Sequence, residues 1–248
     1  MQTIVLATQK GGSGKSTLAI GLALAALQAG HTVRLIETDS QGTLSNWQTR
    51  RPFAEPMVEP VYTSGEIEQK LQSLENSGVT LTIIDTAGGV SAATTAAIRH
   101  ADLCLIPARP SVADIETTAS TLHTVRARNK PFAFILNQTA IRGQRISNAA
   151  TVLSDEAALD GVVASPFIVM RNDHQDALGL GLSVVEYAPA SKSADEVRGL
   201  WQWVEAKLNP VAPSDELPIV DEFSASPDIV PTMFRHVSTE TATIASEF

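Results

Sequence analysis

The residues best suited to chemistry lie near the start of the chain, at residues 9–17, with the sequence Gln-Lys-Gly-Gly-Ser-Gly-Lys-Ser-Thr. An apolar run, residues 3–7, precedes them, and an Ala/Leu-rich segment, residues 17–29, follows, which predicts a strand and then a helix. Glycines let such a loop turn tightly with its N–H groups pointing inward, and the positive end of the helix dipole lies at the same place. The spacing therefore predicts a loop that binds phosphate.

Four side chains are candidates for the chemistry at this loop. Lys15 is placed to reach β and γ phosphates, and the Ser16 hydroxyl suits Mg²⁺. Asp39 and Asp85 each follow an apolar run further along the chain. Because the carboxyl ends of parallel strands meet at one edge of a sheet, we expect Ser16, Asp39 and Asp85 to surround the metal. We expect Asp39 also to orient or polarise an attacking water, although either aspartate alone is as readily a turn former or helix cap.

Composition restricts the class of protein. The chain has 248 residues, of which 44% are hydrophobic and 18% charged, with a formal net charge of −9, as in an ordinary globular protein. Its single cysteine, Cys104, lies in an apolar run, which predicts a core thiol and excludes an intrachain disulfide framework. The chain starts without a secretory signal, and its apolar runs are too short to span a membrane. We expect a cytoplasmic protein with no membrane partner.

Strand-like and helix-like segments alternate along most of the chain. The predicted strands are at residues 3–7, 32–36, 79–84, 103–106, 132–136 and 162–169, and the predicted helices are at residues 17–29, 43–50, 65–75, 91–100, 112–128, 146–159 and 191–208. This order predicts a single α/β domain, residues 1–208, with a mostly parallel sheet flanked by helices on both faces.

The last segment, residues 209–248, differs in composition. It holds seven acidic side chains, one basic side chain and five prolines. We expect an acidic, Pro/Ser-rich, disordered tail. A membrane-targeting helix is the alternative, but such a helix needs basic residues opposite an apolar face.

The loop departs from the usual phosphate-loop pattern. Gln9 stands where that pattern has glycine, and a second lysine follows it, Lys10. The sequence Lys-Gly-Gly-x-Gly-Lys-Ser over residues 10–16 resembles the deviant phosphate loop of the ParA/MinD group of ATPases, in which the first lysine is the signature. Residues 35–47 resemble the second motif of ParA-type partition ATPases, D-x-D-P-Q-x-S-x-x-x-W, with glutamate at position 37 and serine at position 40. Residues 181–187 resemble their C-terminal block.

The resemblance implies a P-loop NTPase fold with ATP and Mg²⁺ as cofactors. The nucleotide ligands that it implies are Lys10, Gly11, Gly12, Ser13, Gly14, Lys15, Ser16, Thr17 and Asn137. It gives catalytic roles to Lys10, Lys15 and Asp39. Asn137 resembles the residue that reads the adenine edge, and a turn or cap asparagine is the alternative.

The resemblance also implies a reaction cycle. ATP would form a homodimer in which Lys10 reaches the phosphates of the other subunit, and the dimer would bind nucleoid DNA without sequence preference. A ParB-like or ribbon-helix-helix centromere-binding partner would stimulate hydrolysis and release. Plausible DNA-contacting residues are Arg171, Lys192 and Arg198, for each of which a solvated surface residue is the alternative. Because the loop begins at residue 9, without the helix-turn-helix segment that larger partition ATPases carry before it, we expect no operator binding.

Two other functions share this scaffold. One is a positioning ATPase whose cargo is a conjugation complex, a carboxysome or a chemoreceptor cluster. The other is a metabolic enzyme such as dethiobiotin synthetase, in which the loop serves phosphoryl transfer to a small molecule. Lys10 and the segment 39–41 favour partition and positioning over the metabolic enzyme.

Overall fold

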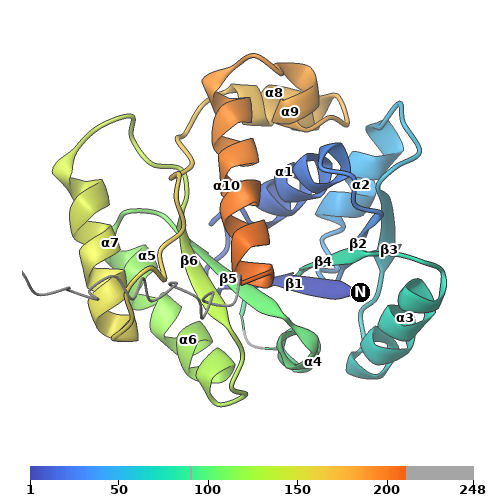
Figure 1. Cartoon of the computed structure of the whole chain (residues 1–248), viewed down its shortest axis with the longest axis horizontal. Helices are drawn as coiled ribbons and strands as arrows, with labels where there is room; N and C mark the ends of the chain where they lie inside the picture. Colours follow the sequence, from blue (N-terminus) through green and yellow to red (C-terminus); the bar gives the residue numbers. More distant parts are fainter. Residues whose placement is uncertain (90, 211–248) are drawn as a thin grey trace, which may run out of the picture. The chain divides into compact units, whose positions relative to one another are not determined.

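Six parallel strands form the centre of the computed structural model, which describes residues 1–89 and 91–210, and their order is β3-β2-β4-β1-β5-β6 (Figure 1). The strands are β1 (Gln2–Leu6), β2 (Val33–Glu37), β3 (Met57–Pro60), β4 (Leu81–Asp85), β5 (Leu103–Ala108) and β6 (Phe132–Leu136). The helices are α1 (Lys15–Gln28), α2 (Thr43–Arg50), α3 (Ser64–Asn76), α4 (Ala92–His100), α5 (Val112–Glu116), α6 (Thr118–Arg126), α7 (Gln144–Ala157), α8 (Asp173–Gly179), α9 (Val184–Tyr187) and α10 (Lys192–Leu208). The predicted α/β fold with a parallel sheet is confirmed.

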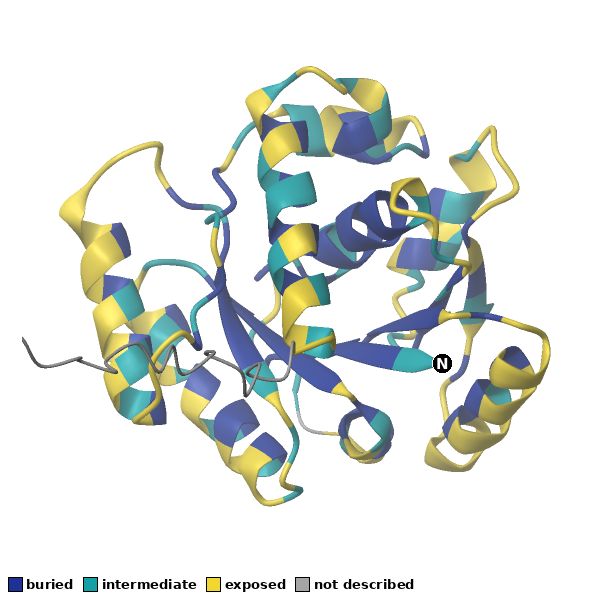
Figure 2. Ribbon diagram, in the orientation of Figure 1, coloured by how far each residue is buried: buried dark blue, intermediate teal, exposed yellow. Residues whose placement is uncertain are grey.

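Alternate residues of each central strand enter different cores. In β1, Ile4 and Leu6 pack with α1, α2, α9 and α10, whereas Val5 packs with α3, α4, α6 and α7 on the other face. This is the period-two pattern of a strand buried on both faces. Figure 2 shows the result, with buried strands between two layers of helices that are exposed on their outer sides.

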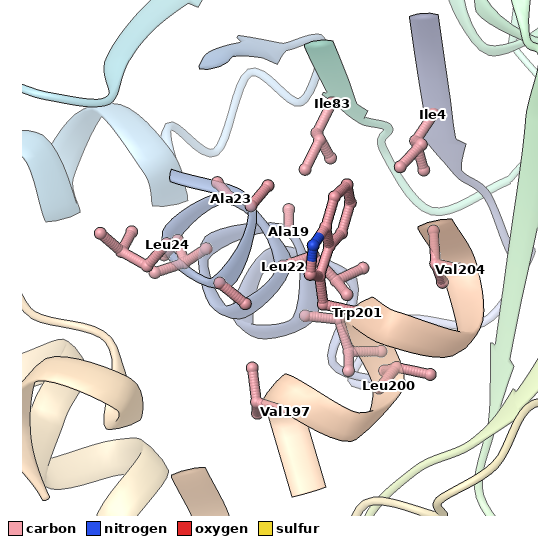
Figure 3. Packing of buried hydrophobic residues seen from close by; sticks show 14 of the residues in the cluster. Ile4, Ala19, Leu22, Ala23, Leu24, Ile83, Val197, Leu200, Trp201 and Val204 are labelled. Atoms are coloured by element: carbon pink, nitrogen blue, oxygen red, sulfur yellow. The ribbon is translucent and has the colours of Figure 1, made fainter. Parts of the chain in front are cut away.

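Helix α1 is buried on nearly all sides because it packs against both the sheet and the neighbouring helices α2, α9 and α10. Residues 18–26 are all buried, and α10 packs beside α1, with Trp201 next to Ile4 and Ile83 of the sheet (Figures 1 and 3). Val197, Leu200 and Trp201 of α10 are at most 3% exposed in this contact. A Cβ on Gly21 would lie 3.2 Å from Val197, so the two helices approach closely there. The lack of charged residues in α1 after Lys15 is therefore a consequence of its position.

Two predicted elements are wrong in detail. The helix predicted over residues 112–128 is broken at Thr117 into α5 and α6. Residues 162–169 make only isolated bridges, at Val163 and Val169, and not a strand. Pro166 lies between these bridges and has no N–H to donate to a ladder.

The C-terminal part of the chain was predicted less completely. Helices α8 and α9 were not predicted, and both are short. The predicted tail lies, from residue 211 onward, outside the described residues. Within residues 1–89 and 91–210 no helix is both long and apolar enough to cross a membrane.

The burial of α10 yields a stability prediction. Trp201 is 3% exposed and fills space between α10 and α1, so Trp201→Ala is expected to lower the free energy of unfolding by about 3–5 kcal/mol. Its exposed neighbour provides the control, because Gln202→Ala is expected to change the free energy by less than about 0.5 kcal/mol. Urea unfolding followed by circular dichroism measures both, and equal effects would contradict the packing described for α10.

Candidate nucleotide-binding site

The loop between β1 and α1 leaves the start of the helix open to an anion. Gly14 is the N-cap of α1 with φ of 89°, no side chain caps the helix, and its first turn has no acidic residue. Gly12 also has a positive φ, 76°, which favours glycine. The first N–H groups of an α-helix have no partner within the helix. The loop therefore presents unpaired donors at the positive end of the helix dipole, as phosphate binding requires.

Two amides from the end of β6 hold this loop in place. The Asn137 side chain donates to the Ser13 carbonyl at 2.8 Å, and the Gln138 side chain donates to the Gly12 carbonyl at 3.0 Å. A Cβ on Gly14 would lie 2.2 Å from Asn137 Nδ2, so only glycine fits. Asn137 thus positions the loop in this structure, and its contact with adenine stays a prediction.

Lys15 and Asp85 place opposite charges in the interior beneath the loop. They are 8% and 1% exposed. Burial lowers the pKa of Lys15, and the negative charges of Asp85 and Asp39 partly offset this. Burial raises the pKa of Asp85 to about 7, although the hydroxyl of Ser16 and the charge of Lys15 favour the ionised form. The predicted convergence of Lys15, Ser16 and the two aspartates is therefore present in the structure.

The surroundings of Asp85 suit a metal ion. Within the part of the chain that the structure describes, neither carboxylate oxygen has a hydrogen bond of acceptable geometry. A buried carboxylate without a partner is costly. Mg²⁺ prefers carboxylate and hydroxyl oxygens together with phosphate oxygens and waters. Asp85 and Ser16 fit such a site, and their role as ligands stays a prediction.

Asp39 lies in the turn that follows β2. It is half-buried, and its Oδ1 accepts a hydrogen bond from the Gln41 N–H at 2.9 Å. The adjacent strand ends are in register, with Glu37 opposite Asp85. Asp39 therefore combines a local turn-forming contact with a position near Lys15 and Asp85, so the two interpretations of this aspartate are compatible.

Lys10 contacts a carboxylate that the sequence analysis missed. Its Nζ lies 2.9 Å from Oδ2 of Asp114 in α5, and Arg109 Nε lies 3.0 Å from Oδ1. Burial alone would raise the pKa of Asp114, but hydrogen bonds from Ser111, Lys10 and Arg109 hold that pKa below its ordinary value. The side chain of Lys10 is 33% exposed, so the lysine sits at the surface beside its own loop. A sequence signal was present, because Ser111 and Asp114 have helix-capping spacing after a strand.

The three proposed DNA contacts differ in how their charge is compensated. Arg171 forms a bidentate ion pair with Glu196, with both N–O distances 2.8 Å. Arg198 lies 3.3 Å from Asp195 within α10. Lys192, the first residue of α10, is exposed and makes no ion pair with the residues that the structure describes. Their DNA contacts stay predictions, and Lys192 has the least compensated charge.

A cavity extends from the loop along α1. It is enclosed by the start of α1, the end of β6, α8 and α10, and its lining includes Thr17, Asn137, Met170 and His174. The Nε2 of His174 is buried without a hydrogen-bond partner among the described residues. Sequence patterns missed Met170 and His174 because they belong to no motif and lie far along the chain from the loop.

Comparison with known proteins agrees with this geometry. Residues 4–177 match the model of the CobQ/CobB/MinD/ParA nucleotide binding domain. The chain belongs to this family. The maintenance of carboxysome distribution protein A of Gloeobacter kilaueensis is 32% identical to it over 217 residues, covering 84% of this chain and 94% of that protein. The chromosome-partitioning ATPase Soj of Thermus thermophilus is 25% identical over 241 residues, covering 84% and 97%.

The ParA/MinD-type fold is also found among solved structures. The septum site-determining protein MinD of Pyrococcus horikoshii, solved in complex with Mg-ADP, superposes with a TM-score of 0.67. The match has 16% sequence identity and covers 82% of this chain and 96% of that one. This match confirms the fold, and the family model matched above confirms the resemblance to the ParA/MinD group.

The close approach at the phosphate loop yields a prediction. Gly14→Ala places a Cβ 2.2 Å from Asn137 and a non-glycine residue at φ of 89°. The variant is expected to lose about 1–3 kcal/mol of stability and at least tenfold in affinity for a fluorescent nucleotide. Gly65→Ala is the control, since nothing lies within 4 Å of its Cβ. Wild-type nucleotide affinity in Gly14→Ala would contradict the close packing described here.

Proposed function

We propose that this protein is an ATPase that dimerises on binding Mg-ATP, binds DNA without sequence preference, and segregates plasmid or chromosomal DNA. The observation that carries the proposal is the position of Lys10. This second lysine of the loop is one-third exposed and contacts Asp114, so its amine lies at the surface. A lysine in this position could reach a neighbouring subunit once it leaves Asp114.

Within one subunit, the buried residues are assigned to positioning and charge. The N–H groups at the start of α1 and the Lys15 ammonium would hold the β and γ phosphates. Ser16 and Asp85 would hold Mg²⁺, which would neutralise charge that develops on the phosphates. Asp39 would orient the attacking water from the turn after β2. This division needs no covalent intermediate, in keeping with the loose transition state of phosphoryl transfer.

In the proposed dimer, Lys10 would leave Asp114 of its own subunit and contact a phosphate bound by the other subunit. A cation that a second subunit contributes at the γ-phosphate stabilises transition-state charge, as an arginine finger does. Asp114 is 4% exposed, but it would keep its ion pair with Arg109 and the hydroxyl of Ser111 when Lys10 leaves. Dimerisation would therefore become conditional on nucleotide without leaving Asp114 unpaired.

DNA binding is proposed to use exposed cations that form no ion pair with a described residue. Residues 117–154 contain no acidic side chain, and Arg142 and Arg145 are exposed there without an ion pair to any described residue. Lys192 on α10 is also exposed and forms no ion pair with a described residue. Non-specific binding requires only such groups near phosphates, and it weakens with salt.

A second candidate is a positioning ATPase with another cargo. The similarity to the carboxysome distribution protein favours it, at 32% identity. Both functions use the same nucleotide cycle, so the partner that stimulates hydrolysis separates them. A small basic DNA-binding protein encoded next to this chain favours partition, whereas a stimulating protein that binds no DNA favours the second candidate.

The role of Lys10 is tested by ATP turnover and oligomeric state. Lys10→Ala is expected to keep ATP affinity within about threefold while dimerisation fails and kcat falls at least about tenfold, because the lysine acts on the other subunit. The matched variant Asp114→Asn keeps Lys10 and removes the charge that holds it, so its ATP-dependent dimerisation is expected to persist. Wild-type kcat in Lys10→Ala would refute the cross-subunit role.

DNA binding is tested in a variant that binds ATP without hydrolysing it. Asp39→Ala with ATP is expected to bind duplexes of unrelated sequence at low salt and to lose at least tenfold in affinity between 50 and 200 mM salt. With ADP, Asp39→Ala should bind DNA weakly. Lys192→Ala should reduce the slope of log affinity against log salt concentration by about one, as expected for the loss of one phosphate contact. If ATP-bound Asp39→Ala bound no duplex at low salt, the DNA-segregation proposal would be wrong.

A further inference from the structure

Glu37 is a buried carboxylate to which the proposed function assigns no role. It ends β2 and is 0% exposed. Within the described residues it forms no salt bridge, and all its hydrogen-bond donors come from the start of α2. The Leu44 N–H donates to Oε1 at 2.6 Å, the Ser45 N–H donates to Oε2 at 3.1 Å, and the Ser45 hydroxyl donates to Oε2 as well. A buried charge needs such donors, because otherwise its desolvation is costly.

Glu37 replaces the missing cap of α2. The N-cap residue of this helix is Gly42, whose backbone is left-handed with φ of 67°, and no neighbouring side chain caps the helix. The carboxylate therefore satisfies N–H groups that would otherwise be unpaired and lies at the positive end of the helix dipole. The glutamate side chain is one methylene longer than the aspartate of the ParA motif, which gives its carboxylate additional reach.

The segment between Glu37 and α2 is fixed at both ends as a result. The Glu37 backbone is paired in the sheet, opposite Asp85 on one side and Pro60 on the other. Its side chain holds the start of α2. Asp39 lies between these two anchors, in a turn closed by the Gly42 N–H, which donates to the Asp39 carbonyl at 3.1 Å. The position of Asp39 thus depends on the contact between Glu37 and α2.

We propose that Glu37 is a positioning residue for ATP hydrolysis, which acts by fixing the turn that carries Asp39. This inference rests on the proposed ATPase function and on the assignment of the attacking water to Asp39. Glu37 touches no reacting atom. Its removal changes the rate of the chemical step and leaves nucleotide binding nearly intact, because the phosphate loop is held separately by Asn137 and Gln138.

The test compares Glu37→Gln with Ser45→Ala and with the control Glu59→Gln, which removes a carboxylate from the adjacent strand. In Glu37→Gln, kcat is expected to fall at least about tenfold with the KM for ATP within about threefold. Amide hydrogen exchange at residues 44 and 45 is expected to accelerate at least tenfold. Ser45→Ala is expected to lower kcat two- to fivefold, and Glu59→Gln to leave it unchanged.

Several results would overturn the inference. Wild-type kcat in Glu37→Gln would do so, and so would a parallel loss of kcat, ATP affinity and unfolding midpoint, which indicates general damage. If Glu37→Gln does not fold, wild-type kcat in Ser45→Ala overturns it. If the wild-type protein binds no ATP and has no turnover, the proposed function fails, and unchanged exchange in Glu37→Gln would separately refute the contact with α2.

Discussion

Burial of charge at the carboxyl edge of the sheet is the constraint on which the rest of the structure depends. Lys15 and Asp85 lie under the phosphate loop with at most 8% exposure, and neither oxygen of Asp85 has a hydrogen bond of acceptable geometry from the described residues. Removing such groups from water costs about several kcal/mol per ion, even after relaxation. A bound phosphate and a divalent cation would supply the missing partners. The site is therefore built to be most stable when a nucleotide is present.

The part of the described chain that follows α7 serves this site more than the sheet. After β6 no further strand forms among the described residues; α7 packs on the face of α4 and α6, and the chain then crosses to the face that carries α1 (Figure 1). Helix α10 packs against the apolar surface of α1, and residues 168–171 help to enclose the cavity beside the loop. Beyond Lys15, α1 carries no charge and is apolar on most sides, so the orientation of the phosphate loop depends on packing supplied by a distant part of the chain.

The parts that could be predicted from the sequence are those set by local patterns. Apolar runs predicted five of the six strands correctly. Asp39 and Asp85 could be predicted as site residues because each follows one of these runs. The contact of Lys10 with Asp114 spans 104 positions, and that of Asn137 with Ser13 spans 124. Neither contact follows from periodicity, because each depends on which strands become neighbours and which rotamers fit. Pro166 was a readable signal, since an apolar run with a proline at its centre makes a poor inner strand.

Asp114 contacts Lys10, and Glu37 holds the turn that carries Asp39. The environments of these two carboxylates differ, and the difference favours different roles for them. Glu37 is fully buried, and its donors are two backbone N–H groups and one hydroxyl. Asp114 is paired with Lys10 and Arg109, whose side chains are 33% and 37% exposed. Asp114 is also buried, at 4% exposure, but it keeps Arg109 and the Ser111 hydroxyl when Lys10 leaves, whereas Glu37 without the donors at the start of α2 is left uncompensated. Under the proposed function, Lys10 would therefore be the part of the site that moves, and Asp39 the part that stays fixed.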